Sequence, residues 1–407
     1  MINIAVMGHG VVGSGVVEVI ERHKQSIAEK SKEQVEIKYI LDLRDFEDLE
    51  YSNKFIKDFN VILNDDSIKI VAEVMGGVNP AYEYVKQCLE KGKSVVTSNK
   101  ELVAAKGVEL LKIANEKNVN FLFEASVGGG IPVLRPIAQC LAANDLYEVL
   151  GILNGTTNFI LTKMAKENMP FSDALALAQQ LGYAERDPSA DIDGHDACRK
   201  ICILASLAFG KHVYPNQVKT EGIKNITLLD KEYADIYGGV IKLIGRAKRL
   251  EDGRISASVY PAIVSRNNQL SCVDDVFNAI MVKGDAIGDV MFYGRGAGKM
   301  PTASAVVADI IDCVKHLKAR KYLSWEDGYD AYVADDSVNN VKLFVCLKNE
   351  SGLKEKIDNI FSKVNYLTRN ASTDEIAFIT PKENEGELEN KIKALNATVI
   401  SKLHIIY

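Results

Sequence analysis

Three glycines near the N-terminus constrain the fold of this chain more than any other feature. Gly8, Gly10 and Gly13 form a G-x-G-x-x-G pattern between an apolar run, 3–7, and the start of a helical pattern. In this context the first glycine permits a tight turn, the second lets a pyrophosphate approach the backbone, and the third lets helix and strand pack closely. Helix amides then face the anion. We expect a dinucleotide-binding loop made of Gly8, Gly10, Val11, Val12 and Gly13; a glycine-rich turn without a ligand is the alternative.

Strand-like and helix-like segments alternate over the first third of the chain. Predicted strands cover 3–7, 35–41, 68–75, 94–97 and 120–123, and predicted helices cover 13–29, 80–91 and 101–117. Such alternation produces right-handed βαβ crossovers and a mostly parallel sheet. We therefore expect an α/β, doubly wound, Rossmann-like domain over residues 1–130.

The rest of the chain predicts two further units. Helical stretches at 159–167, 172–181 and 196–209 precede four long strands within 239–294 and a helix at 302–315. This order favours an α+β substrate-binding and dimerisation domain over 131–318, whose last helix, 302–315, packs back on the first domain. Residues 319–340 are interpreted as a linker. The tail, 341–407, has the order strand, helix, strand, strand, helix, strand, which is the ferredoxin-like pattern.

Composition excludes several partners. The 407 residues carry a net charge of −6, which argues against nucleic acid or an anionic membrane as the main partner. A basic cluster is interpreted as a solvated face: Lys242, Arg246, Lys248 and Arg249. No run is long enough to span a bilayer, and the first strand begins with no signal-peptide pattern before it.

The cysteines point to a reduced compartment. All seven are scattered, and none forms a C-x-x-C pair. His195, Cys198 and Cys202 could share one helix face, but no second ligand pair follows at zinc spacing, so core or loop roles are favoured. We expect a cytoplasmic protein with free thiols.

The region after the second predicted strand carries conflicting signals about the cofactor. A carboxylate at Asp42 would accept the ribose hydroxyls of NAD, whereas Arg44 could pair with the 2′-phosphate of NADP. Both dinucleotides therefore remain open.

Two polar clusters precede predicted helices. Thr97-Ser98-Asn99-Lys100 follows a strand at the sheet edge where ligands bind in open α/β sheets, although a surface lysine at a helix start is the alternative. Asn154-Gly155-Thr156-Thr157-Asn158 is a turn ahead of a helix, and a helix-cap role is expected whatever else it does.

The densest polar cluster begins at residue 182 and ends at Lys200. Asp196 and Lys200 are four residues apart and share a helix face. A surface ion pair is the alternative, but the helix is largely apolar, which favours a buried acid/base site. A positioned ammonium can stabilise the charge left on oxygen by hydride delivery and donate a proton. Nearby carboxylates would hold the α-ammonium group of a substrate.

Seven segments together resemble homoserine dehydrogenases, in that family's order over residues 3–315. They are GHGVVGSGVVEVI, Gly76-Gly77 with Pro80-Ala81, GKSVVTSNK, FEASVGGGIP, NGTTNFIL, GYAERDPSADIDGHDACRK and GRGAGKMPTASAVVADI. The resemblance implies an oxidoreductase that acts on a CH–OH group. It would interconvert L-aspartate 4-semialdehyde and L-homoserine with NAD or NADP, a step towards threonine, methionine and isoleucine.

The resemblance also implies residue roles. Lys200 would donate the proton with Asp196 as its partner, and Lys100 would be a second active-site lysine near cofactor and substrate. Substrate-binding positions are Gly155, Thr156, Glu185, Asp191 and Asp196. Further cofactor-binding positions are Arg44, Gly76, Ser98 and Gly298. Glu124, Val127, Gly129 and Ile131 match a loop that binds a sodium ion largely through backbone carbonyls. The family's usual T-A-N-K reads Thr97-Ser98-Asn99-Lys100 in this chain.

The tail resembles an ACT domain, a regulatory amino-acid-binding module. In the family this module is often linked to inhibition by threonine, but the usual turn reads Asn349-Glu350-Ser351-Gly352 here and lacks the proline. A purely dimer-building tail is the alternative, and we expect a homodimer or homotetramer.

Two rival functions are a dehydrogenase for another amino acid and a non-catalytic sensor of dinucleotide and amino acid. Intact Lys100, Asp196 and Lys200 speak against the sensor.

Overall fold

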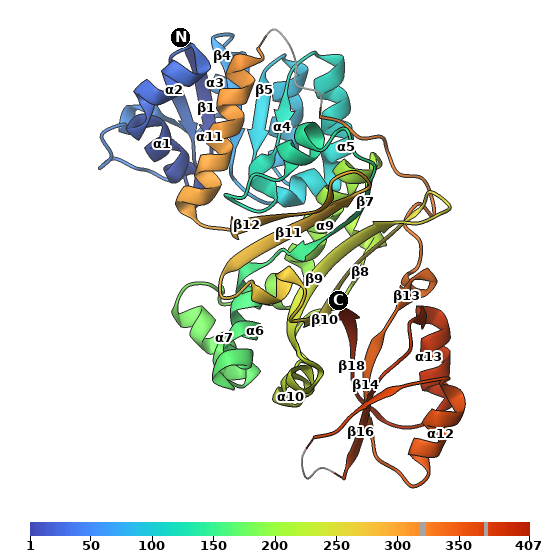
Figure 1. Cartoon of the computed structure of the whole chain (residues 1–407). Coiled ribbons are helices and arrows are strands. Elements are labelled where there is room, and N and C mark those ends of the chain that lie inside the picture. The colour runs from blue at the N-terminus through green and yellow to red at the C-terminus, as the bar shows by residue number, and fades with distance from the viewer. Residues whose placement is uncertain (318–322, 370–372) are drawn as a thin grey trace. The chain divides into compact units, whose positions relative to one another are not determined.

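A computed structural model describes residues 1–317, 323–369 and 373–407 (Figure 1). The chain divides into two compact units. The first unit comprises Met1–Tyr147, Cys202–Pro215 and Ile280–Tyr329, and the second comprises Glu148–Ile201, Asn216–Ala279 and Asp330–Tyr407. Part of the predicted linker, 319–322, lies outside the described residues. Among the described residues, no helix is both long and apolar enough to cross a membrane.

The first unit is built on a six-stranded parallel sheet. Its order is β3-β2-β1-β4-β5-β6, with β1 Ile2–Met7, β2 Val35–Leu41, β3 Phe55–Ile56, β4 Ile68–Glu73, β5 Ser94–Thr97 and β6 Phe121–Leu122. Met7 pairs with Glu73, and Glu73 pairs with Thr97, so the carboxyl ends of the three central strands lie in register. The strand order reverses between β1 and β4, which is where doubly wound sheets bind ligands. The predicted parallel sheet is confirmed.

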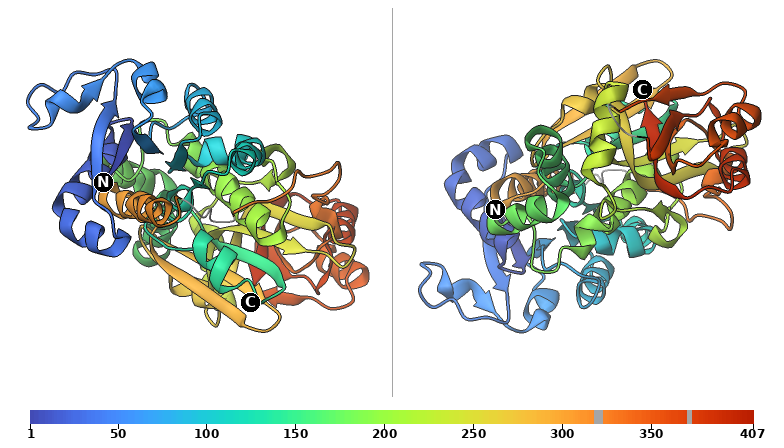
Figure 2. Two further views of the ribbon diagram at one scale, coloured as in Figure 1. Left: turned by 90° about the horizontal axis from the view of Figure 1, so that it is seen from above. Right: turned by 90° about the horizontal axis from the view of Figure 1, so that it is seen from below.

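Helices cover this sheet. They are α1 Val11–Arg22, α2 Lys24–Ser31, α3 Phe59–Asn64, α4 Ala81–Glu90, α5 Lys100–Glu116 and α11 Lys299–Lys315. Helix α11 (orange) lies beside the blue helices α1 and α2 in Figures 1 and 2, and its apolar side shares their core. Gly15 makes this approach possible, because a Cβ there would lie 2.9 Å from both the Lys299 carbonyl oxygen and the Ala303 Cβ.

Two predictions for this unit need correction. The single helix expected over 13–29 is wrong, because the chain leaves helical geometry at His23 (φ −112°, ψ 20°) and restarts as α2. The short elements β3 and α3 were not predicted at all. A signal for α3 exists in the sequence, since Asp58 caps it by accepting the Asn60 N–H at 2.9 Å.

The second unit contains a mixed sheet. Its order is β7-β9-β10-β18-β14-β16-β15, with β7 Leu146–Ile152, β9 Gly239–Arg249, β10 Ile255–Ser265, β14 Leu343–Lys348, β15 Asn365–Leu367, β16 Glu375–Ile379 and β18 Val399–Ile406. Strands β9 and β10 are antiparallel over their whole length. The helices are α6 Gly155–Glu167, α7 Phe171–Gln180, α8 Ser189–Ile192, the start of α9 (His195–Phe209) and α10 Leu228–Tyr237. The predicted mixed sheet is confirmed, but β7 and α10 were missed.

The tail has the predicted element order. Helices α12 (Leu353–Ile360) and α13 (Glu385–Ala394) alternate with β14, β15, β16 and β18 in the βαββαβ pattern. The tail strands lie in the order last, first, third, second, and they bury their own apolar core. Strand β18 also pairs in parallel with β10 through Ala262↔His404 and the next two pairs. The tail therefore extends the sheet of the second unit.

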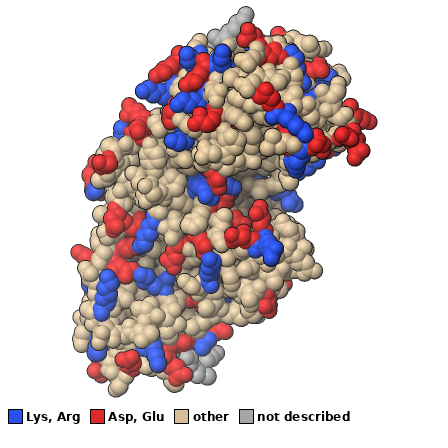
Figure 3. All heavy atoms as spheres, turned by 180° about the vertical axis from the view of Figure 1, so that it is seen from behind, with Lys and Arg blue, Asp and Glu red and all other residues tan. Residues whose placement is uncertain are grey.

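The solvated basic face predicted on β9 is wrong for two of its four residues. Lys242 is only 2% exposed, and the Arg246 side chain is 25% exposed, whereas Lys248 is exposed. The reason is that helices α6 and α10 pack against β9, and most of its side chains are buried. On the face drawn in Figure 3, acidic and basic side chains are interspersed.

Candidate active site

The glycine loop of the first unit leaves an open approach to a helix N-terminus. A Cβ on Gly13 would lie 2.0 Å from the Gly8 carbonyl oxygen, so only glycine allows the loop to close on α1. A Cβ on Gly10 would meet nothing within 4 Å, and α1 begins at Val11 with no side-chain cap. Backbone N–H groups of the first turn of a helix attract anions. These features fit a dinucleotide pyrophosphate.

Asp42 and Arg44 form one compact group beside this loop. Asp42 accepts the backbone N–H of His9 at 2.8 Å and is paired with the Arg44 guanidinium at 2.9–3.0 Å. The hydrogen bonds from Arg44 hold the pKa of the Asp42 carboxyl well below its usual range. Arg44 also lies over the Phe46 ring, 5.1 Å from its centre, and its side chain is 61% exposed. The arginine is thus the outward-facing charge of the pair.

A buried glutamate, Glu73, which was not predicted from the sequence, connects the carboxyl ends of β4 and β5 through hydrogen bonds. Glu73 accepts the Thr97 hydroxyl at 2.6 Å, the Met75 N–H at 2.8 Å and the Gly76 N–H at 3.4 Å. Burial raises its pKa. The signal in the sequence was an acid that ends an apolar strand, since such a residue must find hydrogen-bond donors in the fold.

The turn that carries Lys100 is fixed by its neighbours. Asn99 caps α5 by accepting the Leu102 N–H at 3.1 Å, and its amide donates to the Gly77 carbonyl at 2.6 Å. Ser98 donates its backbone N–H to the Glu73 carbonyl at 3.3 Å. Lys100 is the first residue of α5 and is half-buried. Gly76, Ser98 and Lys100 therefore follow neighbouring strands of one sheet edge.

The predicted cation loop is tied down by a buried carboxylate. Glu124 accepts the N–H groups of Val133, Leu134 and Arg135 at 2.6–2.8 Å, and it donates its own N–H to Asp309 at 2.8 Å. Arg135 pairs with Asp309 at 2.5 Å. The Glu124 carboxylate therefore holds the backbone after the loop in place through three hydrogen bonds.

The glycines of this loop are required by its geometry. Gly128 and Gly129 have positive φ angles of 75° and 55°, and a Cβ on Gly129 would lie 2.5 Å from the Gly296 carbonyl oxygen. Val127 and Ile131 are buried. Gly298, with a φ of 125°, precedes α11 in the same unit.

The second unit holds a buried lysine–carboxylate network. Lys200 Nζ donates to Asp196 Oδ2 and to the Leu153 carbonyl oxygen, both at 2.7 Å. The amide of Asn154 donates to Asp196 Oδ2 at 2.8 Å and to Asp191 Oδ1 at 2.6 Å. The side chains of Lys200 and Asp196 are only 9% and 6% exposed. The surface ion pair considered above is therefore excluded.

Local structure explains this geometry. Asn154 is the N-cap of α6, where its Oδ1 accepts the Thr157 N–H at 2.8 Å, so the same residue starts a helix and orients two carboxylates. Asp196 and Lys200 lie one turn apart on α9. Burial and the nearby charge of Asp196 raise the pKa of Asp191. A raised pKa in a lysine–carboxylate cluster is typical of a functional site.

Gly155 and Thr156 begin α6 directly after Asn154 and so adjoin this network. Thr156 donates its hydroxyl to the Tyr183 carbonyl at 2.7 Å, which ties the first turn of α6 to the loop before α8. Glu185 lies on that loop and is exposed, and its backbone carbonyl accepts from Gln179 at 3.0 Å. Among the described residues, no group of three or more His, Cys, Asp and Glu side chains could hold a metal ion.

The structure thus gathers the predicted residues into two sets. Gly8–Gly13, Arg44, Gly76, Ser98, Lys100, the loop at 124–131 and Gly298 belong to the first unit. Gly155, Thr156, Glu185, Asp191, Asp196 and Lys200 belong to the second unit. A dinucleotide-type sheet together with a buried lysine–carboxylate network defines an oxidoreductase class that uses a nicotinamide dinucleotide.

Comparisons with known proteins give the particular family. The homoserine dehydrogenase family matches residues 132–311, and the family of homoserine dehydrogenase NAD-binding domains matches residues 8–124. Homoserine dehydrogenase of Neisseria gonorrhoeae is 35% identical, with 97% of this chain and 95% of the relative covered. That of Lactococcus lactis is 41% identical over 78% of this chain and 75% of the relative. The chain therefore belongs to the homoserine dehydrogenase family and is an oxidoreductase that acts on a CH–OH group.

Solved structures agree with this assignment. A homoserine dehydrogenase from Thiobacillus denitrificans has a TM-score of 0.92 at 34% identity and covers 99% of this chain and 98% of its own. A hyperthermophilic archaeal homoserine dehydrogenase mutant in complex with NADPH has a TM-score of 0.66 at 29% identity, over 77% of this chain and 97% of its own.

Proposed function

We propose that this chain interconverts L-homoserine and L-aspartate 4-semialdehyde and that Lys200 carries the proton to and from the substrate oxygen. The observation that supports this assignment is the network of Lys200, Asp196, Asn154 and Asp191. In it an ammonium group is fixed by a carboxylate and by the Leu153 carbonyl oxygen. A preorganised ammonium stabilises charge that develops on a nearby oxygen and can then donate its proton.

Each residue of the network has a proposed task. Asp196 orients Lys200, and it balances the ammonium charge in a buried site, where an unpaired charge would be costly. Asp191, with Glu185, holds the α-ammonium group of the substrate. Gly155 and Thr156 form the first turn of α6 and line the substrate position. Lys100 is proposed as a second active-site lysine that contacts both substrate and cofactor.

The proposed cofactor site is the edge of the parallel sheet. Gly8, Gly10, Val11, Val12, Gly13, Gly76, Ser98 and Gly298 would hold the dinucleotide, which supplies or accepts the hydride when bound. We propose that NADP is preferred over NAD. Asp42 already accepts hydrogen bonds from His9 and Arg44, which weakens its role as an acceptor for ribose hydroxyls, whereas exposed Arg44 can pair with a 2′-phosphate.

We also propose that a sodium ion binds the loop through backbone carbonyls of Glu124, Val127, Gly129 and Ile131. The support is a buried, glycine-bent loop beside the carboxylates of Glu124 and Asp309, since carbonyl oxygens are ligands for hard cations. The ion would fix the loop and take no part in proton transfer.

The remaining proposals concern organisation. We propose a dinucleotide domain over 1–130, a substrate-binding and dimerisation domain over 131–318 and an ACT domain over 341–407. The βαββαβ tail with its own core supports the last assignment. The ACT domain would bind threonine as an effector, and the protein would act as a cytoplasmic homodimer or homotetramer in threonine, methionine and isoleucine biosynthesis.

The proposal is tested by oxidation of L-homoserine with NAD or NADP, followed by the absorbance of the reduced nicotinamide. Wild type should turn over, faster with NADP, and Lys200→Ala should lose turnover while it still binds dinucleotide. Lys224→Ala is a matched control, because Lys224 pairs with Asp193 at 2.6 Å on the same unit but is 48% exposed. Normal turnover by Lys200→Ala would reject the role of Lys200.

A further inference from the structure

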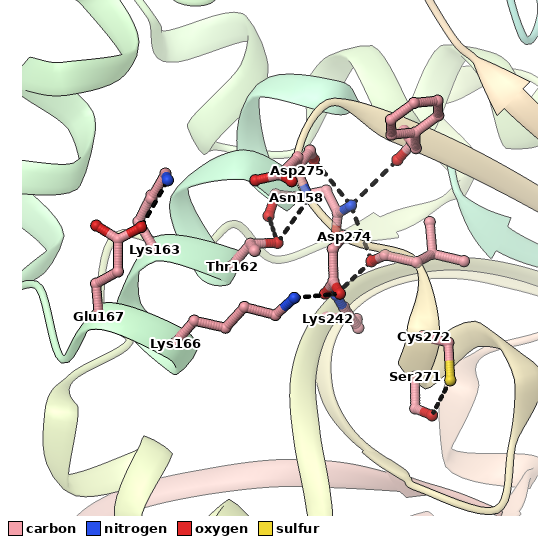
Figure 4. A network of polar contacts seen from close by, with 12 residues as sticks. Asn158, Thr162, Lys163, Lys166, Glu167, Lys242, Ser271, Cys272, Asp274 and Asp275 are labelled. Carbon is pink, nitrogen blue, oxygen red and sulfur yellow. Dashed lines mark hydrogen bonds and ion pairs between the residues drawn. The ribbon is translucent and has the colours of Figure 1, made fainter.

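A second buried lysine, Lys242, lies in the same unit and takes no part in the proposed proton transfer. It is on β9 and only 2% exposed. Its ammonium donates to Asn158 Oδ1 at 3.1 Å, to the Val273 carbonyl oxygen and to Asp274 Oδ1 at 3.3 Å (Figure 4). Three acceptors match the three N–H groups of a lysine. The side chain is therefore fixed in one position.

Asn158, on α6, holds the same segment from the other side. Its amide nitrogen lies 3.1 Å from the carbonyl oxygen of Val273, 3.0 Å from that of Asp275 and 3.1 Å from that of Phe277. Thr162, one turn further along α6, accepts the Asp275 N–H at 3.0 Å. Figure 4 shows these side chains converging on the segment. Residues 273–277, named here the clamped segment, are thus tied to α6 and to β9.

The clamped segment includes one residue in an uncommon backbone conformation. Asp275 has a φ of 53°, a left-handed backbone conformation that residues other than glycine rarely adopt. Conformations of this kind persist only where the surroundings enforce them. Burial lowers the pKa of Lys242, and the charge of Asp274 opposes that change. The three acceptors around the ammonium hold it in this buried position.

The clamped segment lies against the first residue of α6, the helix capped by Asn154. A Cβ on Gly155 would lie only 2.8 Å from the Val276 carbonyl oxygen. Gly155 is the first residue of α6 and follows Asn154, whose amide binds both Asp191 and Asp196. The position of the segment therefore limits where the first turn of α6 and its cap can lie.

We propose that Lys242 is a positioning residue for substrate binding, because it fixes residues 273–277 against Gly155 and so sets the placement of Asn154 and its two carboxylates. This inference rests on the proposed substrate site at Asp191 and α6. It does not depend on which lysine transfers the proton. Lys242 acts through the backbone and through Asn154, so its loss should weaken substrate binding more than it slows the chemical step.

The test compares kinetic constants of the full-length enzyme for L-homoserine and for the dinucleotide. Lys242→Met keeps most of the side-chain volume and removes the ammonium. We expect the KM for homoserine to rise about tenfold or more, since small displacements of positioning groups have effects of this size. The dinucleotide KM and the pH profile of kcat should stay unchanged. Lys242→Gln can still donate hydrogen bonds, so its KM for homoserine should lie between those of wild type and Lys242→Met.

Lys166→Met is the matched control. Lys166 pairs with the Asp274 carboxylate at 2.7 Å, and its side chain is 61% exposed. The hydrogen bonds that define the clamped segment come from Lys242, Asn158 and Thr162, and not from Lys166. Its kinetic constants should equal those of wild type. Asn158→Ala provides a second variant if Lys242→Met fails to fold, with the same expected rise in homoserine KM.

An unchanged homoserine KM in folded Lys242→Met or Asn158→Ala would overturn the inference. A fall in kcat with both KM values unchanged would also overturn it, because that result reports only a loss of active enzyme. Failure of the proposed substrate site looks different, since Asp191→Asn would then leave kcat/KM for homoserine unchanged, whatever the result for Lys242→Met.

Discussion

The cofactor edge of the first unit and the lysine network of the second unit are built on opposite principles. At the cofactor edge the proposed contacts come from the backbone. The glycines at 8, 10 and 13 leave the amide groups at the start of α1 accessible, and no side chain caps that helix. In the lysine network the side chains of Asn154, Asp196 and Lys200 are buried, and hydrogen bonds join them to one another and to the half-buried Asp191. The first region provides space for an anion, and the second provides charges in fixed positions.

This difference predicts how each region responds to change. A site made of backbone and empty space tolerates the loss of a side chain but not the gain of one. A network of buried charges tolerates neither, because each partner that is lost leaves another buried charge uncompensated.

Asp196→Ala should have the largest effect. It leaves the buried Lys200 ammonium without its carboxylate, so we expect turnover to be abolished and the free energy of unfolding to fall by about 3–5 kcal/mol. Denaturant titration and turnover assays measure both. Asp193→Ala, three residues away and paired with Lys224 at the surface, should cost less than about 1 kcal/mol. Equal losses in the two variants would contradict a special role for the buried pair.

Two glycine variants should separate the fold of the cofactor edge from its function. A Cβ at Gly13 meets the Gly8 carbonyl oxygen at 2.0 Å, so Gly13→Ala should destabilise the protein by about 1–3 kcal/mol and weaken dinucleotide binding. A Cβ at Gly10 meets nothing within 4 Å, so Gly10→Ala should keep its stability and lose only affinity. Thermal unfolding measures the stability of the two variants, and dinucleotide titration measures their affinity. Full affinity in Gly10→Ala would show that no phosphate approaches there.

The pH dependence of substrate binding tests Asp191. Its pKa is raised by burial and by the charge of Asp196, so it becomes neutral at a higher pH than an ordinary aspartate. Below that pKa it no longer attracts the substrate ammonium, and kcat/KM for homoserine should fall as pH decreases. Asp191→Asn should lose this acid limb and lower kcat/KM about tenfold or more at neutral pH. An acid limb that persists unchanged in Asp191→Asn would assign it to another group.

Arg44→Ala should have the smallest effect, because the residue is exposed and screened by solvent. We expect the KM for NADP to rise about tenfold, as for the loss of one or two hydrogen bonds to a charged group. The KM for NAD should stay the same or fall, because Asp42 is then released to accept ribose hydroxyls. An equal change for both dinucleotides would reject Arg44 as the residue that selects the cofactor.

The sequence predicted the backbone-built region better than the charge-built one. Local patterns indicate strand ends and glycine turns, so the end of β5 was located to the residue, and the turn after β1 was located although α1 begins at Val11 and not at Gly13. Glu73 and Asn154 were harder, because their tasks depend on donors and acceptors more than 20 residues away. Lys242 was misinterpreted as solvated, since nothing in the local sequence shows that helices α6 and α10 pack against β9.

The most direct test of the central claim compares Lys200→Met with Lys100→Met in reduction of the semialdehyde by NADPH. Lys200 is held in the buried carboxylate network, whereas Lys100 begins α5 at the cofactor edge. The assignment of proton donation to Lys200 predicts that kcat falls about 100–10,000-fold in Lys200→Met, with dinucleotide affinity intact. Lys100→Met should lose less in kcat and more in its KM values. A near wild-type kcat in Lys200→Met, with the large loss in Lys100→Met instead, would contradict the account and assign the proton to Lys100.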